Sequence, residues 1–179
     1  LEQFVEAVPV GQRLLELTEQ ETGPESKSTA MILADLAEAE RIAGIHDSSE
    51  THFLRAIEII RSADGSYSET VIGPLLGLGS NYQDRGDYLE ARVVFEEART
   101  VNRRIFGLLN EGQIDILDLI SQTLSSMNLF VEAHEKQLEG LRLMERKYGE
   151  DTIEVLPAIY KYARWLGGNG LYQAERGQY

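Results

Sequence analysis

Apolar residues recur along this chain at the spacing of one face of an α-helix. One stripe follows the positions i, i+3, i+4 and i+7 at Phe53, Ala56, Ile57 and Ile60. The same spacing returns at Ala91, Val94, Phe95 and Ala98. No run keeps the two-residue alternation of a half-buried strand. The pattern therefore predicts an all-α chain built from amphipathic helices.

Glycine marks a repeat within this helical pattern. Steps of 42 residues separate Gly23, Gly65, Gly107 and Gly149. Steps of the same length connect Gly44, Gly86, Asn128 and Gly170. Because Gly, and after it Asn, most easily adopts a left-handed backbone, the second series predicts the turn between the two helices of one repeat. The first series predicts the end of the second helix of each repeat.

This register divides the chain into one continuous array with an incomplete repeat at each end. The predicted boundaries are a partial repeat over 1–26, complete repeats over 27–67, 68–108 and 109–150, and a partial repeat over 151–179. The first partial repeat would supply only its second helix, roughly from Phe4 to Thr22, and the last would turn at Gly170. Because the sequence begins at Leu1 rather than Met, we expect a fragment of a longer protein.

The second complete repeat carries a recognisable motif. Its residues read Leu78-Gly79-x-x-Tyr82-x-x-x-Gly86-Asp87-Tyr88-x-x-Ala91-x-x-x-Phe95-x-x-Ala98. This run resembles the tetratricopeptide repeat (TPR), whose usual length is about 34 residues. The longer period is similar to that of kinesin light chain and of many bacterial TPR proteins. The resemblance implies a right-handed α–α superhelix, a TPR solenoid of about four helix–turn–helix repeats.

The neighbouring repeats depart from this motif at positions that pack two helices together. Ser49 replaces the small alanine in the first complete repeat. In the third, Gln137 and Gly140 stand where the second has Phe95 and Ala98. In the second repeat we expect small residues to let the two helices approach and the aromatic residues to fill the spaces between repeats.

Composition excludes several classes of function. The chain has 30 acidic and 17 basic residues and a net charge of −13, which argues against binding to nucleic-acid phosphates. The absence of cysteine removes disulfides, thiolate metal sites and cysteine nucleophiles. No stretch approaches the roughly 20 apolar residues of a membrane span, so we expect no membrane insertion. These features predict a soluble protein and leave cytoplasm and periplasm both open.

The sequence holds no catalytic constellation, and we expect neither an enzyme nor a cofactor or metal. His46 and His52 are six residues apart and would point to different faces of one helix. His46 also takes the aromatic position of its repeat, which favours a packed histidine. Gly77-Leu78-Gly79 resembles the start of a phosphate-binding loop, but it lies inside a predicted helix and lacks the third glycine.

The resemblance also implies where a partner would bind, because the first helix of each TPR lines the concave groove. The register places on this face Met31, Ala34, Glu38, Arg41 and Ile42, then Leu76, Ser80 and Gln83, then Asp118, Gln122 and Ser125, and finally Tyr160, Lys161 and Arg164. Apolar members could anchor an apolar side chain, and Lys161 and Arg164 could pair with an acidic group. The lysine positions of a chaperone-tail clamp hold Ala34, Leu76 and Asp118 here, so that ligand is not predicted.

Three functions remain open at this point. The first is a non-catalytic scaffold that binds a peptide or partner protein in the concave groove. The second is a structural spacer or oligomerisation arm, with a homodimer formed through exposed repeat ends that include Phe4 and Val5. The third is a peptide-sensing regulatory domain of a larger protein.

Overall fold

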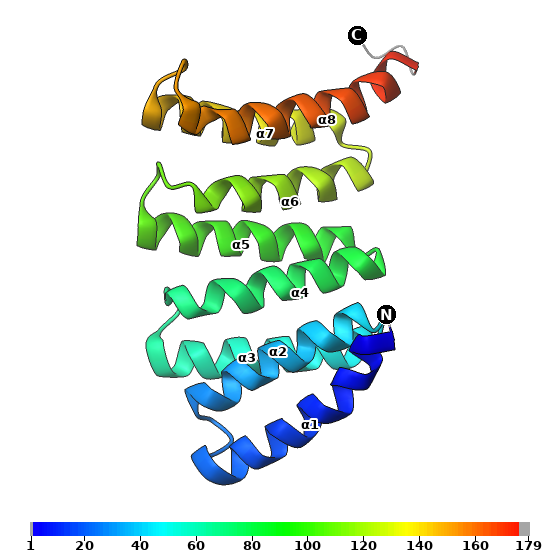
Figure 1. Cartoon of the computed structure of the whole chain (residues 1–179), viewed down its shortest axis with the longest axis vertical. Coiled ribbons are helices and arrows are strands. Elements are labelled where there is room, and N and C mark those ends of the chain that lie inside the picture. The colour runs from blue at the N-terminus through cyan, green and yellow to red at the C-terminus, as the bar shows by residue number, and fades with distance from the viewer. Residues whose placement is uncertain (1, 176–179) are drawn as a thin grey trace. The chain divides into compact units, whose positions relative to one another are not determined.

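The computed structural model describes residues 2–175, and their side chains from Glu6 to Gly168. Within this part the chain forms eight α-helices, two short 3₁₀ helices and no strand (Figure 1). The helices are α1 (Glu2–Thr22), α2 (Lys27–Ile42), α3 (His46–Asp64), α4 (Ile72–Arg85), α5 (Tyr88–Phe106), α6 (Gly112–Ser126), α7 (Phe130–Tyr148) and α8 (Leu156–Glu175). The 3₁₀ helices η1 (Glu69–Val71) and η2 (Ile153–Val155) precede α4 and α8. The predicted all-α class is confirmed.

The turns follow the 42-residue period. Gly44 and Gly86 have φ angles of 80° and 90°, and Asn128 takes a φ of 62° at the third position. They separate the helix pairs α2/α3, α4/α5 and α6/α7. Asn128 is the single non-glycine residue with positive φ in the described chain. Its occurrence at this place confirms that the period marks a left-handed turn.

The predicted turn at Gly170 is wrong. Helix α8 continues through this position from Leu156 to Glu175. A glycine permits a left-handed turn but does not impose one, because its backbone is also compatible with a helix. The side chains of Phe4 and Val5, named above as part of an exposed end, lie outside the described residues.

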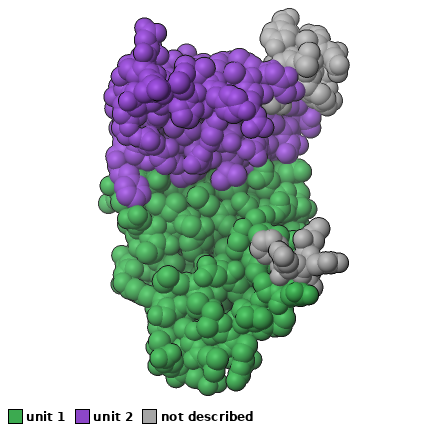
Figure 2. Space-filling model, in the orientation of Figure 1, with its two compact units in different colours: residues 1–105 green, residues 106–179 purple. Residues whose placement is uncertain are grey.

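The chain divides into two compact units, residues 1–105 and 106–179 (Figure 2). In unit 1, helices α1, α2, α3 and α4 pack in succession, and α2 also contacts α4. Its core is a continuous cluster that includes Leu33, Phe53, Ile57, Leu75 and Leu78. In unit 2, α6 packs on α7 and α7 on α8, and a smaller core cluster contains Leu143, Met144, Val155 and Ala158.

Small residues mark the close approach of paired helices. In the first complete repeat the buried Ser49 hydroxyl donates a hydrogen bond to the carbonyl oxygen of Ala37, over 2.8 Å. In the third repeat the arrangement is reversed, and Ser121 on α6 donates to the carbonyl of Ala133 on α7 over 2.9 Å. Serine thus replaces alanine without leaving a buried hydroxyl unpaired, which explains the departure of Ser49 from the motif.

Candidate binding groove

A groove of about 570 Å³ lies in unit 1 between α2 and α4. Helix α2 supplies Lys27, Ala30, Met31, Ala34, Asp35 and Glu38, and α3 supplies Phe53, Ile60 and Asp64. Residues 70–80 supply Thr70, Gly73, Pro74, Leu76, Gly77 and Ser80. Its volume lies within the range of small-ligand and side-chain pockets.

Small residues belong to both walls of the groove. The α2 wall contains Ala30 and Ala34, and the α4 wall contains Gly73 and Gly77. A Cβ atom built on Gly73 would meet no atom within 4 Å, so this part of the wall borders empty space. Phe53 and Ile60, which are 2% and 5% exposed, form the base of the groove.

Gly77 has a second structural role at the base. A Cβ atom at this position would lie 2.5 Å from Cε1 and 3.2 Å from Cε2 of Phe53. These distances are shorter than van der Waals contact, so only glycine lets the Phe53 ring lie against α4. Gly77 and Gly79, in the segment that resembles the start of a phosphate-binding loop, lie inside a helix as expected and pack against aromatic rings.

Charged side chains surround the apolar base. Lys27 pairs with Asp64, and the Arg41 guanidinium lies between Glu38 and Asp84. The hydrogen bonds to Glu38, 2.9 Å from Nε and 2.7 Å from Nη2, are the main cause that holds the pKa of Arg41 above its usual range. Arg41, predicted as a groove residue, thus ties α2 to α4 instead of projecting freely toward a partner.

The structure brings some of the predicted residues together. Met31, Glu38, Leu76 and Ser80 all line the groove, as does Ala34. Met31 is 67% exposed. Gln83 is half-buried on α4 and does not belong to the lining.

The predicted residues of unit 2 are arranged differently. Asp118 accepts hydrogen bonds from Gln137 over 2.6 Å and from Gln122 over 3.1 Å. Lys161 pairs with Asp115, and the Arg164 guanidinium lies 5.8 Å from the centre of the Tyr160 ring. Asp118 and Lys161 line a crevice of about 10 Å³, about the smallest space that can hold one water molecule. Asp118 takes the position that Leu76 has in the second repeat, and Gln137 takes that of Phe95. The hydrogen bond between them accounts for a polar residue at each position.

Sequence reasoning missed several groove residues, among them Lys27, Asp35 and Gly73. A signal for the α4 wall was available, because Gly73, Leu76, Gly77 and Ser80 follow the i, i+3, i+4, i+7 spacing of one helix face. On this face Gly73 borders open space, whereas the Phe53 ring fills the space beside Gly77. No comparable signal exists for Asp64, which comes from the end of α3.

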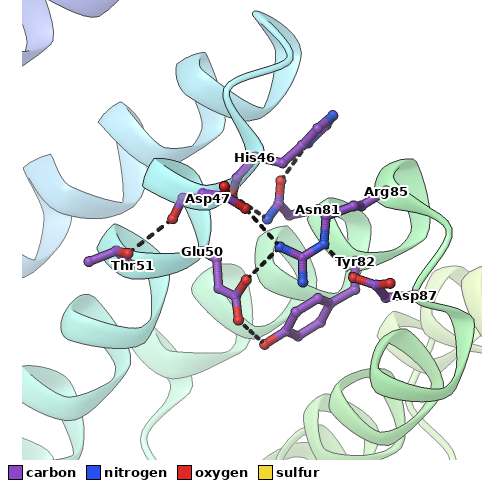
Figure 3. A network of polar contacts seen from close by, with 8 residues as sticks. All are labelled: His46, Asp47, Glu50, Thr51, Asn81, Tyr82, Arg85 and Asp87. Atoms are coloured by element: carbon purple, nitrogen blue, oxygen red, sulfur yellow. Dashed lines mark hydrogen bonds and ion pairs between the residues drawn. The ribbon is translucent and has the colours of Figure 1, made fainter.

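A polar network fixes α4 against α3 beside the groove (Figure 3). The fully buried Asn81 amide donates to the backbone oxygen of His46 over 2.9 Å. Its oxygen lies 2.8 Å from Nδ1 of the same histidine. Since that oxygen can only accept, His46 carries its proton on Nδ1. The predicted packed role of His46 is therefore correct.

Arg85 and Tyr82 complete this network (Figure 3). Arg85 Nη1 donates to Glu50 over 2.8 Å and to Asp47 over 3.2 Å, and its Nε bonds to Asp87. The Tyr82 hydroxyl donates to the other oxygen of Glu50 over 2.8 Å. Burial, followed by this bond to a carboxylate, raises the pKa of Tyr82 to about 12. The network joins the start of α3 to the end of α4 and holds the groove wall in place.

A buried carboxylate performs the same task between α2 and α3. Glu40 is 1% exposed and stands one period before Tyr82, so it holds the position that a tyrosine takes in the second repeat. It accepts a hydrogen bond from Ser48 over 2.8 Å and lies 2.7 Å from Nδ1 of His52. Buried carboxylates need such partners, because an unpaired one is costly. Both walls of the groove are thus held by polar contacts to α3.

The described residues contain no group of three or more His, Cys, Asp or Glu side chains placed to hold a metal ion. Among the same residues, no helix has the length and apolar character needed to cross a membrane.

Comparison with known proteins identifies the repeats. The sequence profile of the tetratricopeptide repeat matches residues 71–146. Residues 71–146 belong to the TPR family. TPR units are generally protein–protein interaction modules, and TPR scaffolds are generally not enzymes. A comparison with curated proteins gives no significant match.

Solved structures of TPR proteins share the fold. A Podosopora anserina protein with nearly identical TPR-like repeats of kinesin-light-chain type is 16% identical, with a TM-score of 0.79. The match covers 98% of this chain and 83% of that one. BtubC (BKLC) from P. vanneervenii is 19% identical with a TM-score of 0.74, and the match covers 83% of this chain and 59% of that one. The predicted TPR-solenoid class is confirmed by these matches, which at such identities concern the fold alone.

Proposed function

We propose that this TPR protein is a non-catalytic scaffold that binds a peptide segment of a partner protein in the groove between α2 and α4. The observation that carries the proposal is an open apolar groove on the helix face where the TPR resemblance places ligand contacts. Met31, Ala34 and Leu76 line it, and Gly73 leaves space for an inserted side chain. Polar contacts from α3 hold both walls, which lowers the cost of ordering the site on binding.

The test uses a substitution that fills the groove without disturbing the fold. Gly73 lies near the start of α4 in helical backbone, and its missing Cβ points to open space. Gly73→Leu should therefore block the groove and leave the helix intact or slightly more stable. Gly167→Leu is the matched control, because Gly167 is a helical glycine of α8 with equally open surroundings.

The measurement is selection from a random peptide-display library on the immobilised full chain. We expect enriched peptides that bind the unchanged protein and Gly167→Leu but lose binding to Gly73→Leu. Peptides that bind Gly73→Leu equally well would place the binding surface elsewhere. A selection that enriches no peptide would contradict a peptide-binding role.

A second candidate function, self-association, is favoured by one feature of α1. Val10, Leu14 and Leu17 follow one face of this helix and are 69%, 47% and 46% exposed. One period later, Ala56 and Ile59 hold the positions of Leu14 and Leu17 and are 0% and 1% exposed. The bare face could accept a helix from a second copy of the chain.

Light scattering at rising concentration tests this candidate. Self-association through α1 predicts a dimer that Leu14→Glu and Leu17→Glu abolish. A control on an exposed residue of another helix, Val93→Glu, should leave the dimer intact. A protein that stays monomeric at all concentrations would exclude this candidate.

A further inference from the structure

The charges around the groove indicate which kind of peptide it accepts. Six ionisable side chains stand on or beside its rim: Lys27, Asp35, Glu38, Arg41, Asp64 and Asp84. Four of them are carboxylates and two are cations, so the rim has a net charge of −2. Both cations are already paired within the protein, Lys27 with Asp64 and Arg41 with Glu38 and Asp84. The rim therefore offers negative charge to an approaching ligand.

Asp35 is the carboxylate best placed for a partner. It is exposed, lines the groove, and has no hydrogen bond or ion pair among the described side chains. The corresponding position one period later is Gly77, which has no side chain that could cover it. Arg41 is committed to the two carboxylates next to it, so it does not neutralise Asp35.

The apolar part of the groove lies beside this carboxylate. Ala34 precedes Asp35 on α2, and Leu76 precedes Gly77 on α4, with Phe53 beneath. A bulky apolar side chain inserted here would bury itself against Phe53, Leu76 and the flexible Met31 thioether. A cation next to that side chain in the peptide would come close to Asp35.

We propose that the groove binds a basic–apolar peptide, whose bulky apolar side chain fills the space above Phe53 while an adjacent lysine or arginine pairs with Asp35. This inference rests on the proposed function of the groove. The partner segment is then cationic as well as apolar, and acidic segments are excluded. The net charge of −13 on the whole chain acts in the same direction, because it attracts cationic ligands at long range.

Three synthetic peptides of equal length test the chemistry by fluorescence anisotropy on the full chain. The first alternates leucine with lysine, the second leucine with glutamate, and the third serine with lysine. We expect the leucine–lysine peptide to bind most tightly, with affinity that falls as salt rises. The serine–lysine peptide lacks the anchor and should bind weakly, and the leucine–glutamate peptide should be repelled.

Two variants separate the charge from the groove. Asp35→Asn should weaken the leucine–lysine peptide about two- to fivefold, the usual effect of one partly exposed ion pair. Asp35→Lys should weaken it more and improve the leucine–glutamate peptide. The control Asp151→Asn removes an exposed carboxylate of unit 2 and should change neither affinity.

The outcomes distinguish this inference from the function on which it rests. Equal affinity for the lysine and glutamate peptides, both lost in Gly73→Leu, would keep the groove as the binding site and overturn the charge preference. Binding of the leucine–lysine peptide that survives Gly73→Leu would overturn the groove itself. No binding of the leucine–lysine peptide would overturn the inference, while peptides selected from a random library and blocked by Gly73→Leu would still support the proposed function.

Discussion

Replacement of Gly79 by alanine should destabilise the protein, although alanine is the better helix former. Gly79 lies inside α4, and a Cβ atom there would be 2.6 Å from Cδ1 and 2.9 Å from Cζ of Phe95. The Phe95 side chain is 0% exposed, so its ring has no free space into which it can move. The clash is therefore resolved by strain in the core rather than by a rotamer change at the surface.

The size of the effect follows from two opposed terms. Alanine gains about 1 kcal/mol over glycine in a helix interior. Overpacking a core costs about 1–3 kcal/mol, and the enclosed ring places this site near the upper value. We expect Gly79→Ala to lower the free energy of unfolding by about 2 kcal/mol.

Urea unfolding followed by circular dichroism measures this change. The matched control is Gly73→Ala in the same helix, where the new Cβ meets nothing within 4 Å and stability should stay the same or rise. In a Phe95→Leu background, which removes the ring, the cost of Gly79→Ala should shrink by about 1 kcal/mol or more. The reasoning is refuted if Gly79→Ala stabilises the protein as much as Gly73→Ala does.

Three further predictions address other contacts. Glu40→Ala should lower the free energy of unfolding in urea by about 3 kcal/mol because it breaks a buried polar cluster. Glu38→Ala on the same helix should lower it by less than about 1 kcal/mol, and equal losses of stability in the two variants would contradict the role of burial. Asn128→Ala should lower the free energy of unfolding by about 1 kcal/mol because alanine disfavours positive φ, and Asn128→Gly should leave it unchanged. An alanine variant as stable as the glycine variant would exclude this cause. The raised pKa of Tyr82 stabilises the fold below about pH 10, the ordinary value for tyrosine, and this contribution is lost as the pH rises through about 12. The tyrosinate absorbance difference between the unchanged protein and Tyr82→Phe should therefore titrate near pH 12, and a midpoint near the ordinary value would disagree with the burial of this hydroxyl.

The helices and most turns could be predicted from the sequence because they depend on local residues that recur. Asn128 shows this well, since the 42-residue period predicts for it the left-handed conformation that it shares with Gly44 and Gly86. The same argument failed at Gly170, where α8 continues. A glycine allows a turn, but whether the chain turns also depends on packing that the period does not contain.

The candidate site was only partly predictable because it depends on contacts between distant residues. The helix face of Met31 and Leu76 followed from the register, and both residues line the groove. The pairing of Arg41 did not follow from the register, because its second partner, Asp84, is 43 residues away in the sequence. The same limit applies to Glu40, whose partners lie on the next helix. Sequence spacing thus predicts which face is available, while ion pairs across helices decide which of its charges are free.

Methionine methyl NMR tests the central claim most directly, because one of the three methionines lines the groove. Met31 is in the groove of unit 1, whereas Met127 and the buried Met144 belong to unit 2 and serve as internal controls. On titration of the methyl-labelled protein with the leucine–lysine peptide, we expect the Met31 signal to shift and saturate while the other two stay in place. Peptide binding detected by anisotropy with an unmoved Met31 signal would contradict the proposal that this groove is the binding site.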